Sequence, residues 1–175
     1  MQNNLVITAL GENDTRLVEY FTKAVRDCGC RICEFRMAAL GDQFAMLLMV
    51  GGPWDAIAKM EDWLPKLEER LGLSITSTRS KPQKPSQPMM PYAIDVVCCE
   101  QIGVVYEITK FIADNNIGIQ GLYTNSYNAA HTGTPMFSLH MTINIPTDVS
   151  IAALRGDFMD FCDQLNLDAI MEPVK

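Results

Sequence analysis

The chain has 175 residues, 48% of them apolar and 20% charged, which is typical of a globular protein and excludes a disordered one. No apolar stretch approaches the roughly 18 residues that a membrane-spanning helix needs, and no basic leader precedes the first apolar run, so we expect a cytoplasmic protein. The chain has a net charge of −7, and residues 92–175 alone account for it, with three Lys/Arg against ten Asp/Glu. We therefore do not expect this part of the chain to bind nucleic-acid phosphates directly.

The first half of the chain carries signals for six elements in the order strand, helix, strand, strand, helix, strand. Helical spacing of apolar residues predicts the two helices, and alternation of apolar with other residues predicts half-buried strands. Gly41-Asp42 is a hairpin signal between the second and third strands. The predicted ranges are strand 5–10, helix 17–28, strands 31–40 and 44–50, helix 55–71 with Pro65 as a kink or restart, and strand 73–78.

A proline-rich segment follows. Residues 80–91 contain four prolines and no apolar periodicity before Met89. Such a composition is typical of a semi-extended linker. We therefore predict a first domain over 1–80, a linker over 81–91 and a second domain over 92–175.

The second half repeats the first at an offset of 87 residues. Ile7/Ile94, Thr22/Thr109 and Lys23/Lys110 are among the identical pairs. A period near 90 residues matches a whole small domain, so the chain is predicted to be a tandem duplication. The second set of predicted ranges is strand 92–97, helix 102–115, strands 117–127 and 136–145, helix 148–165 and strand 167–171.

The repeated order βαββαβ predicts an α+β chain of two ferredoxin-like domains, each an antiparallel four-stranded sheet with both helices on one face. The hairpin 128–134 is longer than its counterpart Gly41-Asp42, and its role stays open. Small domains with exposed edge strands need cover, so we expect the two copies to associate and the chain to form a homo-oligomer.

Six cysteines and two histidines offer little catalytic chemistry. The group Cys28, Cys30 and Cys33 spans a helix end, a turn and a strand, so the three thiols converge poorly on a metal ion. We interpret them as structural thiols, with a metal or redox role as the alternative. No catalytic motif is present, and we predict a non-enzymatic protein with no cofactor and no metal.

The turn before the second copy's first helix is the stronger candidate for a binding site. It reads Glu100, Gln101, Ile102, Gly103, which places an acid three residues before a glycine at a helix start. Free backbone N–H groups there suit a carboxylate, and Glu100 could hold an ammonium group. Ordinary helix capping is the alternative interpretation.

This acid-x-x-Gly turn, occurring in a duplicated βαββαβ unit, resembles the ACT domain family of amino-acid-binding regulatory modules. The resemblance implies ligand contacts at the turn and at Asn115, Asn116 and Ile117, where the neighbouring strand begins. The first copy has Asn13, Asp14, Thr15 and Arg16 at the corresponding positions. Arg16 replaces the glycine, where it would block a ligand or pair with its carboxylate, so the number of sites stays open.

Residues 5–11, 28–30, 37–41 and 52–57 more narrowly resemble family members that are stand-alone domain pairs without a DNA-binding module. That resemblance implies a transcriptional regulator that responds to a small amino acid, with glycine expected. It would repress the glycine cleavage operon by binding a DNA-binding activator of the LysR type. The alternative is a regulatory subunit of a metabolic enzyme that binds a different small amino acid.

Overall fold

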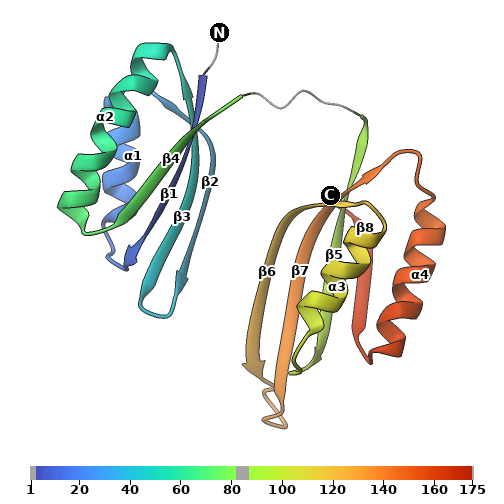
Figure 1. Cartoon of the computed structure of the whole chain (residues 1–175). Helices are drawn as coiled ribbons and strands as arrows, with labels where there is room; N and C mark the ends of the chain where they lie inside the picture. Colours follow the sequence, from blue (N-terminus) through green and yellow to red (C-terminus); the bar gives the residue numbers. More distant parts are fainter. Residues whose placement is uncertain (1–2, 82–86, 175) are drawn as a thin grey trace. The chain divides into compact units, whose positions relative to one another are not determined.

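The computed structural model describes residues 3–81 and 87–174, and the chain divides into two compact units, Met1–Lys84 and Pro85–Lys175. Each unit is a four-stranded antiparallel sheet with its two helices on one face (Figure 1). The predicted α+β fold with two ferredoxin-like βαββαβ units is confirmed.

The first unit has its strands in the order β2-β3-β1-β4. Its long helix continues through Pro65, so the predicted restart is wrong, and a kink there stays a prediction. Burial of Leu64 and Leu67 on either side of the proline offsets the backbone hydrogen bond that proline cannot make. The elements are β1 (Asn3–Glu12), α1 (Leu17–Asp27), β2 (Arg31–Leu40), β3 (Gln43–Gly52), α2 (Trp54–Leu71) and β4 (Ser74–Ser80).

The second unit repeats this topology in the order β6-β7-β5-β8. Ile7 of β1 lies opposite Leu48 and Ser77, and the equivalent Ile94 lies opposite Met141 and Met171. The elements are β5 (Met89–Cys99), α3 (Val104–Asp114), β6 (Gly118–Asn128), β7 (Pro135–Pro146), α4 (Ile151–Gln164) and β8 (Asp168–Pro173). The loop 129–134 joins β6 to β7, where only residues 41–42 join β2 to β3.

Each core lies between a sheet and its two helices. Side chains alternate between the two faces of a strand, so every second residue of β1 and β5 points toward the helices. The apolar faces of the amphipathic helices pack against these side chains. In the second unit Phe158 of α4 is fully buried, and its ring centroid lies 5.4 Å from that of Phe111 on α3. No polar or charged residue is buried among the described residues.

The outer strands β2 and β6 are more exposed than predicted. Only Phe35 in β2 and Gly121 in β6 are even partly buried. A bulge between Ile32 and Glu34 breaks the predicted alternation, so Cys33 does not share a face with Phe35. The predicted strand over 31–40 is confirmed as β2, but the prediction that it is half-buried is wrong, because an edge strand has a neighbour on one side only.

The predicted linker 81–91 is shorter in the structure. Met89, Met90 and Pro91 belong to β5 and lie opposite Pro146, Ile145 and Asn144 of β7. Sequence alternation did not reveal this extension, because Pro91 and the adjoining methionines resemble the proline-rich segment. Residues 82–86 of the predicted linker lie outside the described residues.

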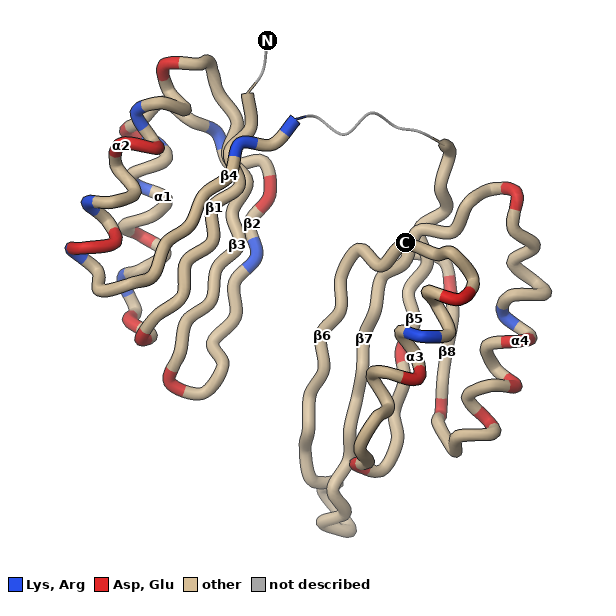
Figure 2. Tube along the Cα trace, in the orientation of Figure 1, with Lys and Arg blue, Asp and Glu red and all other residues tan. Residues whose placement is uncertain are grey.

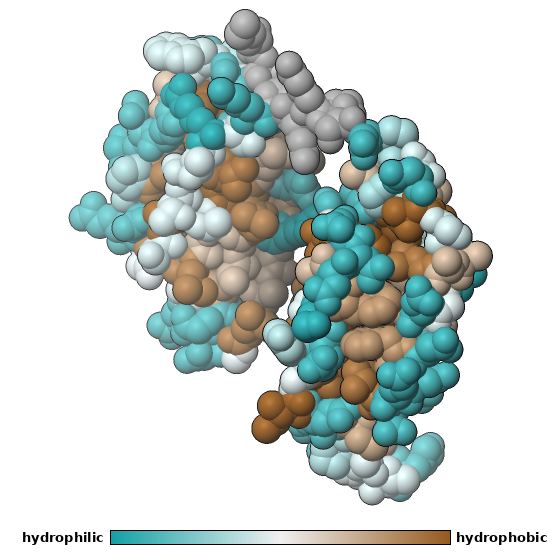
Figure 3. Space-filling view, turned by 45° about the vertical axis from the view of Figure 1, so that its right-hand side comes forward, coloured by the Kyte–Doolittle hydropathy of each residue, from teal (hydrophilic) through white to brown (hydrophobic). Residues whose placement is uncertain are grey.

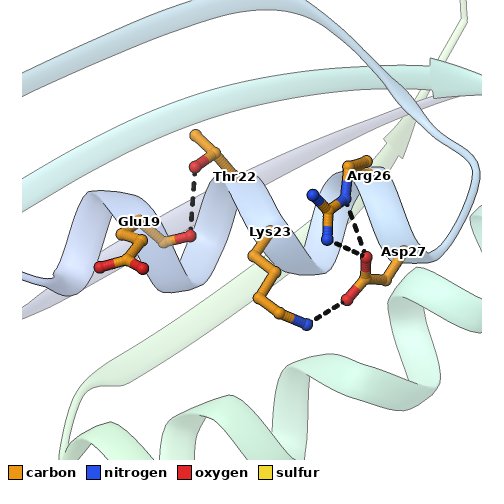
Figure 4. A network of polar contacts seen from close by, with 5 residues as sticks. All are labelled: Glu19, Thr22, Lys23, Arg26 and Asp27. Carbon is orange, nitrogen blue, oxygen red and sulfur yellow. Dashed lines mark hydrogen bonds and ion pairs between the residues drawn. The ribbon is translucent and has the colours of Figure 1, made fainter.

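The duplication extends to surface hydrogen bonds on the first helix of each unit. On α1 the hydroxyl of Thr22 donates to backbone carbonyls one turn earlier, and Lys23 pairs with Asp27, which also accepts from Arg26 (Figure 4). On α3 Thr109 and the pair Lys110–Asp114 repeat this arrangement. Exposed pairs of this kind stabilise a helix only slightly, so the repetition marks common descent more than stability.

Within residues 3–81 and 87–174, no helix has both the length and the apolar character needed to cross a bilayer.

Candidate functional site

The turn between β5 and α3 is held at its base and open at its tip. The Glu100 N–H donates to the Pro135 carbonyl of β7 at 3.0 Å, which fixes the start of the turn. Ile102 is fully solvent-exposed. Gly103 is the N-cap of α3 with φ +95° and ψ −6°, a left-handed conformation that glycine adopts without steric cost.

The start of α3 can accept an anion. The N-cap residue Gly103 has no side chain, so it offers no side-chain acceptor to the first backbone N–H groups of α3. A Cβ placed on Gly103 would have no heavy atom within 4 Å, so a ligand could approach the backbone closely. The positive end of the helix dipole favours a carboxylate there. The carboxylate of Glu100 lies beside β6, where the Ser126 hydroxyl donates to it at 3.5 Å.

The predicted contacts at Asn115, Asn116 and Ile117 lie at the other end of α3. Asn115 is the C-cap, and its side-chain amide donates to the Phe111 carbonyl at 2.8 Å. Asn116 has φ +55°, and Ile117 is buried. Eleven helical residues span about 16 Å, so within the second unit these residues and the turn do not line one pocket.

The corresponding turn of the first unit is held by one side-chain and one backbone hydrogen bond. Asp14 accepts from the Arg16 N–H at 2.8 Å, and the Asn13 N–H donates to the Asp42 carbonyl at 3.0 Å. Arg16, at the position of Gly103, has φ −99° and needs no glycine. Thr15 completes this turn on the surface. The two turns therefore share their attachment to the sheet and differ in what they offer a ligand.

The six thiols are all free, and their burial differs. Cys28 and Cys98 are buried, and burial raises the pKa of both thiols. Burial raises the pKa of Cys162 on α4 to about 11. Groups of three or more His, Cys, Asp or Glu that could hold a metal ion are absent from the part of the chain that the structure describes. Such buried thiols are poor nucleophiles and fit the structural interpretation.

A second polar cluster, which the sequence did not reveal, lies on the open face of the second sheet, the face that α3 and α4 leave uncovered. His140 of β7 lies with Nδ1 2.6 Å from Oδ1 of Asp95 on β5, and its ring stacks on Tyr123 of β6 at a centroid distance of 4.8 Å. The signal available in the sequence was Asp95, a lone charge within the apolar strand 92–97. Its partner across the sheet can be identified only once the strand register is known.

Comparison with known proteins gives matches along most of the chain. The ACT domain family model matches residues 3–78. The glycine cleavage system transcriptional repressors of Escherichia coli (strain K12) and Shigella flexneri are each 28% identical over 167 residues, covering 94% of this chain and 87% of the relative. Both relatives are named as repressors and neither as an enzyme, in agreement with the prediction of a non-enzymatic protein.

Two solved structures share the whole fold. One is an unknown protein from Galdieria sulphuraria, with a TM-score of 0.79 and 21% identity over the full length of both chains. The other is assigned as a glycine cleavage system transcriptional repressor, with a TM-score of 0.74 and 22% identity over 100% of this chain and 99% of that one. At such identities the likeness shows the fold alone. The ACT domain match covers residues 3–78, and the second unit repeats the topology of the first, so the chain resembles tandem ACT-domain proteins and the glycine cleavage system transcriptional repressor.

Proposed function

We propose that this protein is an amino-acid-responsive transcriptional regulator that represses the glycine cleavage operon by holding a DNA-binding activator of the LysR type. Glycine is the proposed effector. The turn at Gly103 carries the proposal, because no side chain caps the start of α3 and a Cβ on Gly103 would have no heavy atom within 4 Å, which leaves room for a carboxylate.

The chemistry of the turn suits a small zwitterion. The start of α3 would take the carboxylate, and Glu100 would take the ammonium group. Open space around Gly103 allows close approach, whereas Asp14 and Arg16 occupy the equivalent turn of the first unit. The second unit is therefore the proposed effector-binding unit. Asn115, Asn116 and Ile117, at the other end of α3, stay proposed ligand contacts.

Action through a protein partner is supported by charge and by the relatives. The second unit carries seven more acidic than basic residues, three Lys/Arg against ten Asp/Glu over 92–175 (Figure 2). The two repressors cover nearly the whole chain at 28% identity. A regulator that carries such charge would reach DNA through another protein.

The test combines effector and partner. A ligand that binds only the folded state stabilises it by mass action, about 2.7 kcal/mol at a concentration of 100 times its Kd. We expect glycine, among the twenty amino acids, to raise the melting temperature saturably at millimolar concentration. We also expect a tagged chain to capture the activator in a glycine-dependent way. A melting temperature insensitive to all twenty, or capture of a metabolic enzyme in place of the activator, would contradict the proposal.

A further inference from the structure

The open faces of the two sheets have diverged at equivalent positions. Strand register aligns one row across each sheet. In the first unit the row is Arg36, Leu47, Thr8 and Thr76, and in the second it is Tyr123, His140, Asp95 and Ile170. Because these positions are equivalent in the two units, the comparison shows how the chemistry of the two faces differs.

The second face carries three carboxylates at positions where the first face has none. Asp95, Asp168 and Glu172 stand where the first unit has Thr8, Ser74 and Thr78, all uncharged. Between residues 87 and 174 the Lys and Arg residues are Lys110 on α3 and Arg155 on α4, both on helices that cover the opposite face (Figure 2). Within the described residues, no Lys or Arg neutralises the open face.

The same face exposes large side chains. Tyr123 is 66% exposed, Ile170 is 60% exposed and Tyr127 is 42% exposed. Hydrophobic side chains also reach the surface elsewhere on both units, as Figure 3 shows, so exposure alone does not mark a binding surface. Here the exposed residues include two tyrosines, which are enriched in protein interfaces, and they lie on the same sheet face as the carboxylates.

We infer that the open face of the second sheet is a docking surface for a basic, arginine-bearing surface of a protein partner. Arginine pairs with carboxylates and also stacks on aromatic rings, so it matches both groups that this face presents. Asp95 and Tyr123 flank the His140 ring in one cross-strand row, and the His140–Asp95 contact holds that row in place. A DNA-binding protein carries basic surfaces of this kind.

Two other occupants fit less well. Nucleic-acid phosphates would meet three carboxylates without a Lys or Arg beside them on the described strands. A second copy of the same face would bring carboxylates against carboxylates, which is unfavourable in an isologous contact. The inference rests on the proposed function only in naming the partner as the activator, since the surface chemistry itself is a property of this chain.

The experiment uses the full ¹⁵N-labelled chain and a synthetic heptapeptide with arginine at alternate positions, titrated at low salt. A peptide with glutamine in place of arginine is the control ligand. The face variant is D95N/D168N/E172Q, and the matched variant D157N/D160N/D163N removes three exposed charges from α4 instead. Y123A tests the aromatic contribution separately. Purified activator is titrated in parallel against the same variants.

We expect the arginine peptide to shift amides of β5–β8, the face variant to weaken its binding about tenfold, and the α4 variant to change it by less than about twofold. Y123A should also weaken binding. Equal losses in the two triple variants, shifts centred on α4, or no binding at all would overturn the inference. If the peptide binds this face and the activator does not bind the chain, the proposed partner is wrong while the docking surface stands. Activator binding that the face variant leaves unchanged would overturn the docking surface alone.

Discussion

Gly103→Ala separates the two roles of the β5–α3 turn. An alanine at φ +95° lies in the sterically unfavourable left-handed region, which lowers the free energy of unfolding by about 1–2 kcal/mol. No clash adds to this cost, because a Cβ there has no heavy atom within 4 Å. For a unit of this size, we expect the melting temperature of the second unit to fall by roughly 5–15 °C.

The matched control is Gly133→Ala. Gly133 lies in the loop 129–134, has φ +69°, and likewise has open space around a new Cβ. The two variants should lose similar stability, but only Gly103→Ala places a methyl group where the effector would approach. We expect Gly103→Ala to raise the glycine concentration needed for half-maximal stabilisation at least about tenfold, and Gly133→Ala to leave it unchanged.

Calorimetry of the full chain, with and without glycine, makes the measurement. Tryptophan fluorescence reports on the first unit, because Trp54 and Trp63 both lie on α2. A transition seen by calorimetry and absent from the fluorescence trace belongs to the second unit. The reasoning is refuted if Gly103→Ala is as stable as the wild type, or if both variants keep the wild-type response to glycine.

Phe158→Ala should destabilise the second unit by about 3–5 kcal/mol, because the ring is fully buried and leaves a cavity; urea unfolding followed by circular dichroism measures it. Under native conditions iodoacetamide should label exposed Cys33 and spare Cys162, whose pKa burial raises to about 11, with mass spectrometry as readout; early labelling of Cys162 would contradict its burial. Hydrogen bonding from Lys23 lowers the pKa of Asp27, so its stabilising effect is present above the unfolded-state pKa and is lost as pH falls through the folded-state value. Asp27→Asn should therefore lower the urea midpoint at about pH 7 and not at about pH 2.

The duplicated fold could be predicted because the identities between the two halves and their apolar periodicity indicate the same elements. The identities at an offset of 87, such as Lys23/Lys110, accompany the same apolar periodicity, and register in both sheets places Ile7 and Ile94 at equivalent positions. The burial of the edge strands could not be predicted in this way. The bulge between Ile32 and Glu34 changes which side chains share a face, and no local signal marks it.

The candidate site was predictable only in part. Gly103 follows from local chemistry, because an uncapped helix start after an acidic residue is visible in the sequence. The separation of Asn115 from Gly103 follows from helix length, which the predicted range 102–115 already contained. The Asp95–His140–Tyr123 row was not predictable, because it joins three strands whose register only the folded sheet determines.

The central claim is that the second unit receives a small amino acid at the start of α3, and an NMR titration of the full ¹⁵N-labelled chain with glycine tests it most directly. The account predicts saturable shifts at the amides of residues 101–106, with the equivalent amides 14–19 of the first unit unchanged. Shifts confined to the first unit, or none at millimolar glycine, would contradict it.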